Sequence, residues 1–418
     1  MLLFVGLYQS WNLAAAIFNL CLISAIMSLG VNIQWGYAGL FNVGIMGFAA
    51  LGGVAAVLVS APPVAAAWRA GGQGVLLALG CVILVVLAIG MLRKRVRNRR
   101  HRVVAITSTV AVGYFAARHF FDPATLAIEK VDPAATGFLG GLGLPIIVSW
   151  LLGGLLAGCV AWAIGRITLN LRSDYLAIAT LGISEIIIAV LKNEDWLTRG
   201  VKNVIGLPRP VPYEIELQRE EWFIGLAQSL NAELTTFSSL WVKVCYALIF
   251  LAVLVLLLWL CERALNSPWG RMMRCIRDNE EAAHAMGKDI VGRRLQVFVL
   301  GSMVIGVAGA MLTTLDGQFT PGSYQPMRFT FLIWVMVIVG GSANNWGSIL
   351  GGFLIWFVWV EAEPVGGWLM DVVTSGLATD HPLRTHLLAN AAHTRLFVMG
   401  VILLLVLRFF PRGLIPER

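Results

Sequence analysis

Long apolar segments recur along the whole chain, and they limit what it can fold into more than any other feature. Most are nearly free of charge and have the roughly 20 residues that a helix needs to cross a bilayer. Because lipid offers no hydrogen bonds to an exposed backbone, such segments fold as helices. We expect spans at about 11–31, 38–60, 75–92, 103–121, 142–165, 174–191, 240–261, 295–315, 328–341, 347–363 and 395–410.

The composition is that of an integral membrane protein. Of the 418 residues, 58% are hydrophobic and 13% are charged, and the mean hydropathy is +0.79. We therefore predict an all-α, polytopic integral membrane protein with about 10–11 transmembrane helices in a single domain over residues 1–418. The segment at 328–341 is short, so it is a candidate half-helix or re-entrant piece.

Basic residues cluster in the short loops between spans, which indicates the topology. The run 93–102 holds seven Lys or Arg residues and no acid, so the positive-inside rule makes it a basic cytoplasmic loop. Counting spans from it places the 262–294 loop and the C-terminal tail inside, and the 192–239 loop outside. The net charge of +8 thus suits topology and contact with anionic lipid. We expect no nucleic-acid partner, because this loop has no aromatic or groove-reading element.

The charged loop at 262–294 contains a short helix motif. Asp278 is a candidate N-cap and Glu281 stands three residues later, as in a capping box. A helix from 279 to 286 would then end at Gly287 in a left-handed turn. Ala282 and Ala283 would let another protein approach the backbone closely. The pattern therefore favours a docking helix, and an amphipathic helix lying on the bilayer surface is the alternative.

Polar residues inside the spans are candidates for a transport path, because polar groups at membrane depth need partners or water. Asn32, Gln34 and Asn42 lie in a glycine-rich stretch, which glycine packing would also explain. Asp174 and Glu185 lie eleven residues apart and thus nearly on one helix face, with Asp174 at the cytoplasmic end and Glu185 well inside the bilayer. Glu185 could equally be a buried structural acceptor.

A break at Gly340-Gly341 and Asn344 separates two apolar segments. Irregular backbone at membrane depth occurs where protein or a water-filled path covers it, so the break is a candidate gate or hinge. The alternative is a short cytoplasmic turn, which agrees with the span count.

We find no constellation for catalysis or cofactor binding. The sequence has no phosphate-binding G-x-x-x-x-G-K-[ST], no H-E-x-x-H and no nucleophile elbow, and its six histidines show no metal-ligand spacing. We expect no catalytic site, cofactor or metal. Energy from ATP would have to come through another chain.

Three stretches, together with the break at Gly340-Gly341 and Asn344, carry a resemblance to a known family. The glycine-rich 32–53 stretch, the D-Y-L-A-I-x-T-L-G-x-x-E-I pattern from Asp174 and the E-A-A-x-x-x-G motif from Glu281 resemble permease subunits of branched-chain (hydrophobic) amino acid ABC importers. The stretch at about 61–135 is longer than expected for the family, and we interpret it as an insertion.

The resemblance implies a permease in the bacterial inner membrane that works by alternating access. Its partners would be a second homologous permease subunit, two cytoplasmic ABC ATPase subunits and an extracytoplasmic substrate-binding protein. The loop with Asp278, Glu281, Ala282, Ala283 and Gly287 would contact the ATPase. Two alternatives remain open. One is a urea or short-chain amide ABC permease, and the other is a self-contained proton- or ion-coupled transporter using Asp174 and Glu185.

Overall fold

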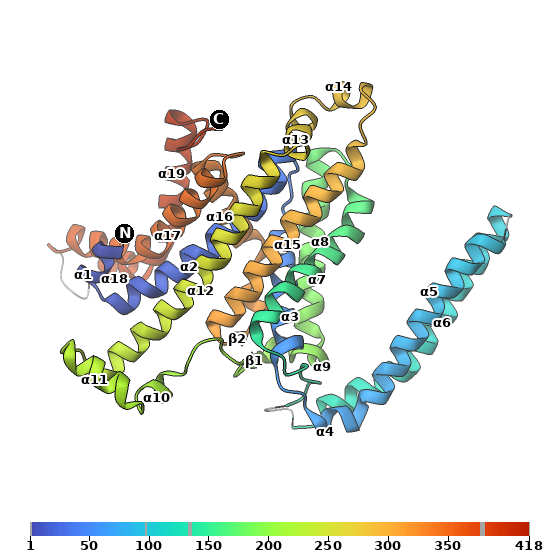
Figure 1. The fold of residues 1–418 in the computed structure, drawn as a ribbon, viewed down its shortest axis with the longest axis horizontal. Helices are drawn as coiled ribbons and strands as arrows, with labels where there is room; N and C mark the ends of the chain where they lie inside the picture. Colours follow the sequence, from blue (N-terminus) through green and yellow to red (C-terminus); the bar gives the residue numbers. More distant parts are fainter. Residues whose placement is uncertain (1, 97, 133–135, 377–380, 418) are drawn as a thin grey trace.

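Helices make up nearly all of the regular structure. The computed structural model describes residues 2–96, 98–132, 136–376 and 381–417. The helices of the bundle are α2 (Trp11–Ala38), α3 (Ile45–Ser60), α7 (Ile146–Thr168), α8 (Ser173–Asn193), α12 (Leu234–Leu265), α15 (Ile290–Asp316), α16 (Pro326–Gly340), α17 (Asn345–Val373) and α19 (Thr394–Phe409) (Figure 1).

The remaining elements are shorter or stand apart from the bundle. They are α1 (Leu2–Tyr8), α4 (Ala65–Ala67), η1 (Trp68–Gly72), α5 (Gln73–Arg95), α6 (Arg99–Glu129), α9 (Asp195–Thr198), η2 (Gly200–Lys202), β1 (Val204–Ile205), α10 (Glu214–Leu217), α11 (Glu221–Ser229), α13 (Pro268–Asp278), α14 (Glu280–Ala285), β2 (Gln318–Phe319), η3 (Pro321–Ser323), α18 (Pro382–Ala389) and η4 (Ala391–His393).

The predicted all-α, polytopic fold is confirmed. In the described residues, nine helices are long and apolar enough to cross a membrane, and the shorter apolar helices α3 and α16 lie among them. Each predicted span overlaps one of these helices. The largest boundary difference is at the predicted span 347–363, because α17 continues to Val373. The predicted span 38–60 starts too early: α2 continues to Ala38, residues 39–44 are not helical, and α3 begins only at Ile45.

The core is built around α15, which packs against α2, α3 and α7. Small residues let these backbones approach closely. A Cβ added to Gly52 would lie 1.9 Å from the carbonyl oxygen of Gly306, and one added to Gly309 would lie 2.0 Å from that of Ala49. Such contacts are how helices associate in lipid, where no hydrophobic force drives them together.

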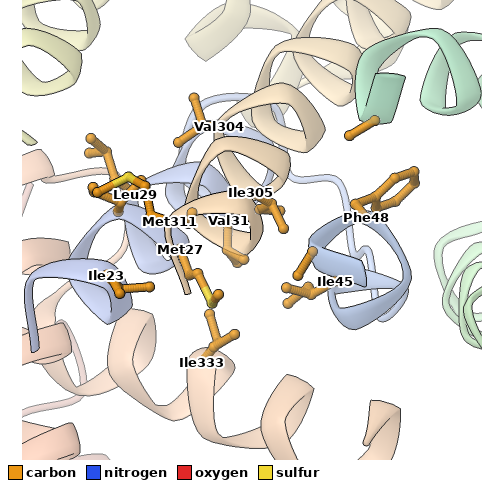
Figure 2. Close-up of a cluster of buried hydrophobic side chains, with 14 of the residues drawn as sticks. Ile23, Met27, Leu29, Val31, Ile45, Phe48, Val304, Ile305, Met311 and Ile333 are labelled. Atoms are coloured by element: carbon orange, nitrogen blue, oxygen red, sulfur yellow. The ribbon is translucent and has the colours of Figure 1, made fainter. Parts of the chain in front are cut away.

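Apolar side chains fill the space around this close contact. Figure 2 shows Met27 and Val31 of α2, Ile45 and Phe48 of α3, and Ile305 of α15 converging on one cluster, and all five are buried. On the other side of α2, helices α17, α16 and α12 complete the bundle, with α17 packing on α2 and α16.

The two ends of the bundle differ. One end carries α13 and α14, whereas α4, α9, α10 and the β1–β2 pair lie at the other (Figure 1). The β1–β2 pair is antiparallel and sets Val204 opposite Phe319. Within the 192–239 segment, Phe223 is fully buried against the rings of Phe237 and Trp241. This segment is therefore a packed cap and not a loose linker.

Candidate coupling surface and membrane path

The amphipathic helix α13 forms the base of the charged loop. Ser267 caps its first turn and Pro268 occupies the first helical position, which favours a helix start there. Met273 and Ile276 are almost fully buried, and α13 packs on α2. The loop is therefore held on the end of the bundle by apolar contacts.

Arg277 ties α13 to two other parts of the chain. Its Nη1 donates to the carbonyl oxygen of Gly36 in α2, and its Nη2 lies 2.9 Å from a carboxylate oxygen of Glu417 in the C-terminal tail. Its Nε also donates to Asp278 at 3.0 Å. Burial lowers the pKa of Arg277, but the hydrogen bonds to Glu417 and Asp278 outweigh it and raise that pKa.

The predicted docking helix is present but begins one residue later. Asp278 is the last residue of α13, so its backbone is helical and it cannot act as the N-cap. Asn279 takes that role, with φ −151° and ψ 99°, and its Oδ1 accepts from the backbone N–H of Ala282 at 2.9 Å. The proposed N-cap at Asp278 was therefore wrong, and with it the capping box with Glu281.

The left-handed stop at Gly287 is confirmed. Gly287 has φ +72°, and a Cβ added there would meet no atom within 4 Å. A side chain at this position would thus be opposed by backbone strain alone. Helix α14 spans Glu280–Ala285, and the N–H of Gly287 bonds to the carbonyl of His284.

Helix α14 protrudes from the end of the bundle (Figure 1). Glu281 and Ala282 are exposed, as is Met286, whose side chain is 77% accessible, whereas Ala283 is buried underneath. Arg294 of α15 holds the helix by a bidentate ion pair with Glu280, at 2.7 and 2.8 Å. The surface thus has a base fixed by this ion pair and an accessible tip with small and apolar side chains beside the carboxylate of Glu281.

A cleft of about 450 Å³ opens beside α14. It lies between the α2–α3 connection, the α7–α8 turn and the start of α15, and its lining includes Leu40, Arg172 and Arg294. The cleft and the exposed face of α14 together form what we call the coupling surface, defined by residues 39–41, 169–173 and 279–288.

A buried polar network lies between this surface and the bundle. Oδ1 of Asn345 accepts from Tyr37 at 2.5 Å and from Asn32 at 3.1 Å, and its Nδ2 donates to Glu262 at 3.0 Å. Asn32 also accepts from the N–H of Ala343 at 2.8 Å. These bonds connect α2, α12 and α17. The side chain of Asn32 therefore joins helices.

Gln34 and Asn42 stabilise the break between α2 and α3. Nε2 of Gln34 donates to Phe298 and Ser302 of α15, and its Oε1 accepts from Asn42 at 2.9 Å. Asn42 in turn accepts from the N–H of Gly44, just before α3 starts. Both side chains are at most 1% exposed. The two side chains hydrogen-bond to each other, and Asn42 also accepts from a backbone N–H of the non-helical segment 39–44. Irregular backbone at membrane depth requires such partners.

Asp174 and Glu185 both lie on the outer surface of α8. Asp174 is exposed in the first turn, and Glu185 is exposed near the middle of the helix. Of the two alternatives left open for Glu185, the buried structural acceptor is therefore contradicted within this chain, and the transport-path role stays a prediction. Its neighbours on this face are apolar and open, with Ile178 69% and Ile186 63% exposed. The inner face of α8 instead supplies Ser184, which bonds to the N–H of Gly47.

The break at 340–344 is a tight turn. Gly340 ends α16, Gly341 has φ +119°, and the side chain of Asn344 caps α17 by accepting from two backbone N–H groups. The C-terminal tail closes over it, with the N–H of Ile415 bonded to the carbonyl of Gly340. The turn thus lies at the same end of the bundle as α13, as the cytoplasmic-turn alternative expects.

An apolar cavity of about 200 Å³ lies inside the bundle, between α2, α15, α16 and α17. Ile23, Met27 and Ile333 line it, and Tyr324 and Asp316 lie on its rim toward the end opposite the coupling surface. Its volume and apolar lining suit the side chain of a small hydrophobic ligand.

Several functional residues escaped the sequence analysis. Arg277 and Arg294 hold the charged loop on the bundle, and Asn345 joins α2, α12 and α17, yet each stands among similar neighbours in the sequence. Asn345 gave a weak signal, since it directly follows Asn344 in the break. The partners of the two arginines, Glu417 and Glu280, could not be paired with them without the fold.

Comparison with known proteins places the chain in a family. The model of the branched-chain amino acid transport system permease component matches residues 124–407. The chain belongs to this family. As a family member it is a membrane permease component and not a catalytic subunit. The match begins at 124, so α5 and most of α6 lie outside it.

Curated relatives agree with that assignment. The probable branched-chain amino acid transport permease protein LivM of Methanocaldococcus jannaschii is 27% identical over 71% of this chain and 74% of its own length. The high-affinity LivM proteins of Salmonella typhimurium and Escherichia coli are 28% and 27% identical, each over 49% of this chain. The chain spans about half of their length, 48% in each case. No solved structure matches this permease.

We predict that Asn345 is needed for stability. Replacing it with Leu leaves Tyr37 and Glu262 without their shared partner, so Asn345→Leu should lower the free energy of unfolding by about 1–3 kcal/mol. Denaturant titration of the purified protein measures this. The control is Asn193→Ala, because Asn193 is exposed and bonds only to its own helix. Equal stability of the two variants would contradict a structural role for the network.

Proposed function

We propose that this permease is the membrane subunit of an ATP-driven ABC importer that moves branched-chain or other hydrophobic amino acids into the cell by alternating access. One observation carries the proposal: a short capped helix, α14, protrudes from the bundle, is bonded to α15 through Glu280–Arg294, and adjoins Arg277 of α13, which is bonded to α2. Two cytoplasmic ATPase subunits supply the energy in this account, and the permease itself binds no ATP.

The contacts around α14 suggest how a push at the surface would reach the membrane. A force on Ala282 or Met286 passes through the Glu280–Arg294 pair into α15, the central helix of the bundle. Through Arg277 it also reaches α2 at Gly36. Such coupling requires elements with two discrete arrangements. In our proposal the two arrangements are the outward-open and inward-open states of the helices.

The outer face of α8 is proposed to contact a second, homologous permease subunit. Glu185 would be expensive to expose to hydrocarbon, because a carboxylate at membrane depth needs a partner or water. The exposure of Glu185 among exposed apolar residues is explained if a second subunit packs over this face, or if a water-filled path between the two subunits hydrates the carboxylate. Asp174 would then lie at the cytoplasmic mouth of that path.

The opposite end of the bundle would receive the extracytoplasmic substrate-binding protein. There the packed cap of 192–239 and the rim of the apolar cavity lie near one another. We infer that the protein is a multi-pass component of a bacterial inner membrane. The self-contained transporter is less well supported, since both of its carboxylates, Asp174 and Glu185, face outward from α8.

The left-handed turn at Gly287 should be required for coupling. A residue with a Cβ costs about 1–2 kcal/mol in this conformation, and a β-branched one more. We expect Gly287→Val, in the assembled complex, to fold and insert normally and to hydrolyse ATP, while uptake of labelled leucine falls roughly tenfold. In the wild type, unlabelled valine should compete for that uptake and urea should not.

The control is Gly287→Asn, because Asn tolerates the left-handed region and should keep most of the uptake. Normal uptake by Gly287→Val would contradict the role given to α14. Competition by urea alone would leave α14 in place and assign the substrate to the amide class.

The α8 interface can be tested by photo-crosslinking in intact membranes. A benzophenone amino acid at Ile178 should give an adduct with the second permease subunit. The same probe at Leu84 of α5, where exposure is nearly equal at 66%, should not. Crosslinking of Ile178 to lipid only would contradict the proposed interface.

A further inference from the structure

The α5–α6 hairpin is packed almost entirely on itself. Gly113 of α6 contacts Val85 of α5, and Gly74 of α5 contacts Ala124 of α6. Its main contacts with the rest of the chain lie at its base, where Phe121 meets the ring of Trp196 at 5.3 Å. Figure 1 shows the hairpin leaning away from the bundle over its whole length.

The surface of the hairpin is apolar on its outward faces. Residues 75–92 contain no charged side chain, nor do residues 103–117. Only 6% of the most apolar window of each helix is buried. Large side chains such as Leu84, Val86 and Phe115 are 62–72% exposed. In water such a surface would associate, so hydrocarbon or a partner protein has to cover it. At 1.5 Å per residue, 75–92 covers about 27 Å, close to the thickness of a bilayer core.

The tip of the hairpin is strongly basic. Seven Lys and Arg residues and no acidic residue lie between 93 and 102. Arg93, Lys94, Arg95, Arg99 and Arg100 are exposed, and among the described residues no carboxylate forms an ion pair with them. Elsewhere in the hairpin, the charge of Arg118 is balanced by an ion pair with Asp122, whose Oδ2 lies 2.9 Å from Nη2 of the arginine. The excess charge is therefore confined to the tip.

The uncharged stretches 75–92 and 103–117, which we call the apolar shaft of the hairpin, determine where this charge lies. A shaft that spans the hydrocarbon places its tip at the headgroup level, and Figure 1 shows the tip directed to the same end as α14. We propose that the hairpin is a lipid-embedded arm whose basic tip binds anionic phospholipid headgroups of the cytoplasmic leaflet. Clustered Lys and Arg beside a membrane helix are attracted to the negative potential of that leaflet. This inference is independent of the importer function proposed above.

Native mass spectrometry of the full-length protein tests the binding. The protein is released from nanodiscs that contain equal amounts of phosphatidylglycerol and phosphatidylethanolamine, and the retained lipids are counted. We expect the wild type to retain phosphatidylglycerol preferentially. The variant with Arg93, Lys94, Arg99 and Arg100 replaced by Gln should lose that preference roughly tenfold. High salt should weaken retention in the wild type but change it little in the variant.

The matched control removes cations from the same end of the protein without touching the hairpin. Arg408→Gln with Arg412→Gln should leave the lipid preference unchanged, whereas Arg99→Gln with Arg100→Gln should reduce it. Equal retention by wild type and the four-residue variant, with both folded by circular dichroism, would overturn the proposal. A photo-probe at Val112 that labels protein in place of lipid would also overturn it, because a protein would then cover the shaft.

Discussion

The close approach of α15 to α2, α3 and α7 is the contact on which the rest of the structure depends. It requires glycine where backbones meet, as at Gly52 and Gly306, because even a methyl group would collide with a carbonyl oxygen. The same helix begins at the coupling surface with Arg294 and ends beside β2 at the opposite end of the bundle. Any movement of its first turn must therefore be passed to helices packed along its whole length, since a tightly packed core deforms little.

Buried amides complement this packing at the two places where the chain is irregular. Gln34 and Asn42 satisfy the segment between α2 and α3, and Asn345 joins three helices close to the turn at 341–344. Both sites lie near the coupling surface. They hold the irregular backbone in one arrangement by specific hydrogen bonds, which a different arrangement of the helices could exchange. We infer that rearrangement would begin there.

The helices and the docking motif could be predicted from the sequence, because hydropathy, helix caps and helix-terminating glycines are local properties. Gly287 illustrates this, since one residue type and its spacing predicted the left-handed stop. The N-cap residue of α14 could not be predicted, because α13 and α14 are separated by a single residue. Asp278 and Asn279 are both suitable N-cap residues, and Asn279 takes the role only because α13 extends to Asp278.

Side-chain orientation and long-range pairing could not be predicted. Glu185 falls on the outer face of α8 because Thr180 and Ser184 point inward, to the N–H groups of Val43 in the α2–α3 break and of Gly47 in the first turn of α3, and that choice follows from tertiary packing. The pairs Arg277–Glu417 and Arg294–Glu280 join residues far apart in the sequence or separated by a turn. Similarly, the apolar character of α5 predicted a span but not that the hairpin would stand apart from the bundle.

Co-purification is the most direct test of the central claim, that α14 connects this permease to an ATPase. The chain would be expressed with the genes neighbouring its own, solubilised in mild detergent and captured by a tag, once as wild type and once with residues 278–288 scrambled. Our account predicts that an ATPase subunit is captured with the wild type and lost with the scrambled loop, while both forms remain folded. Equal capture by both forms, or no ATPase with either, would contradict it.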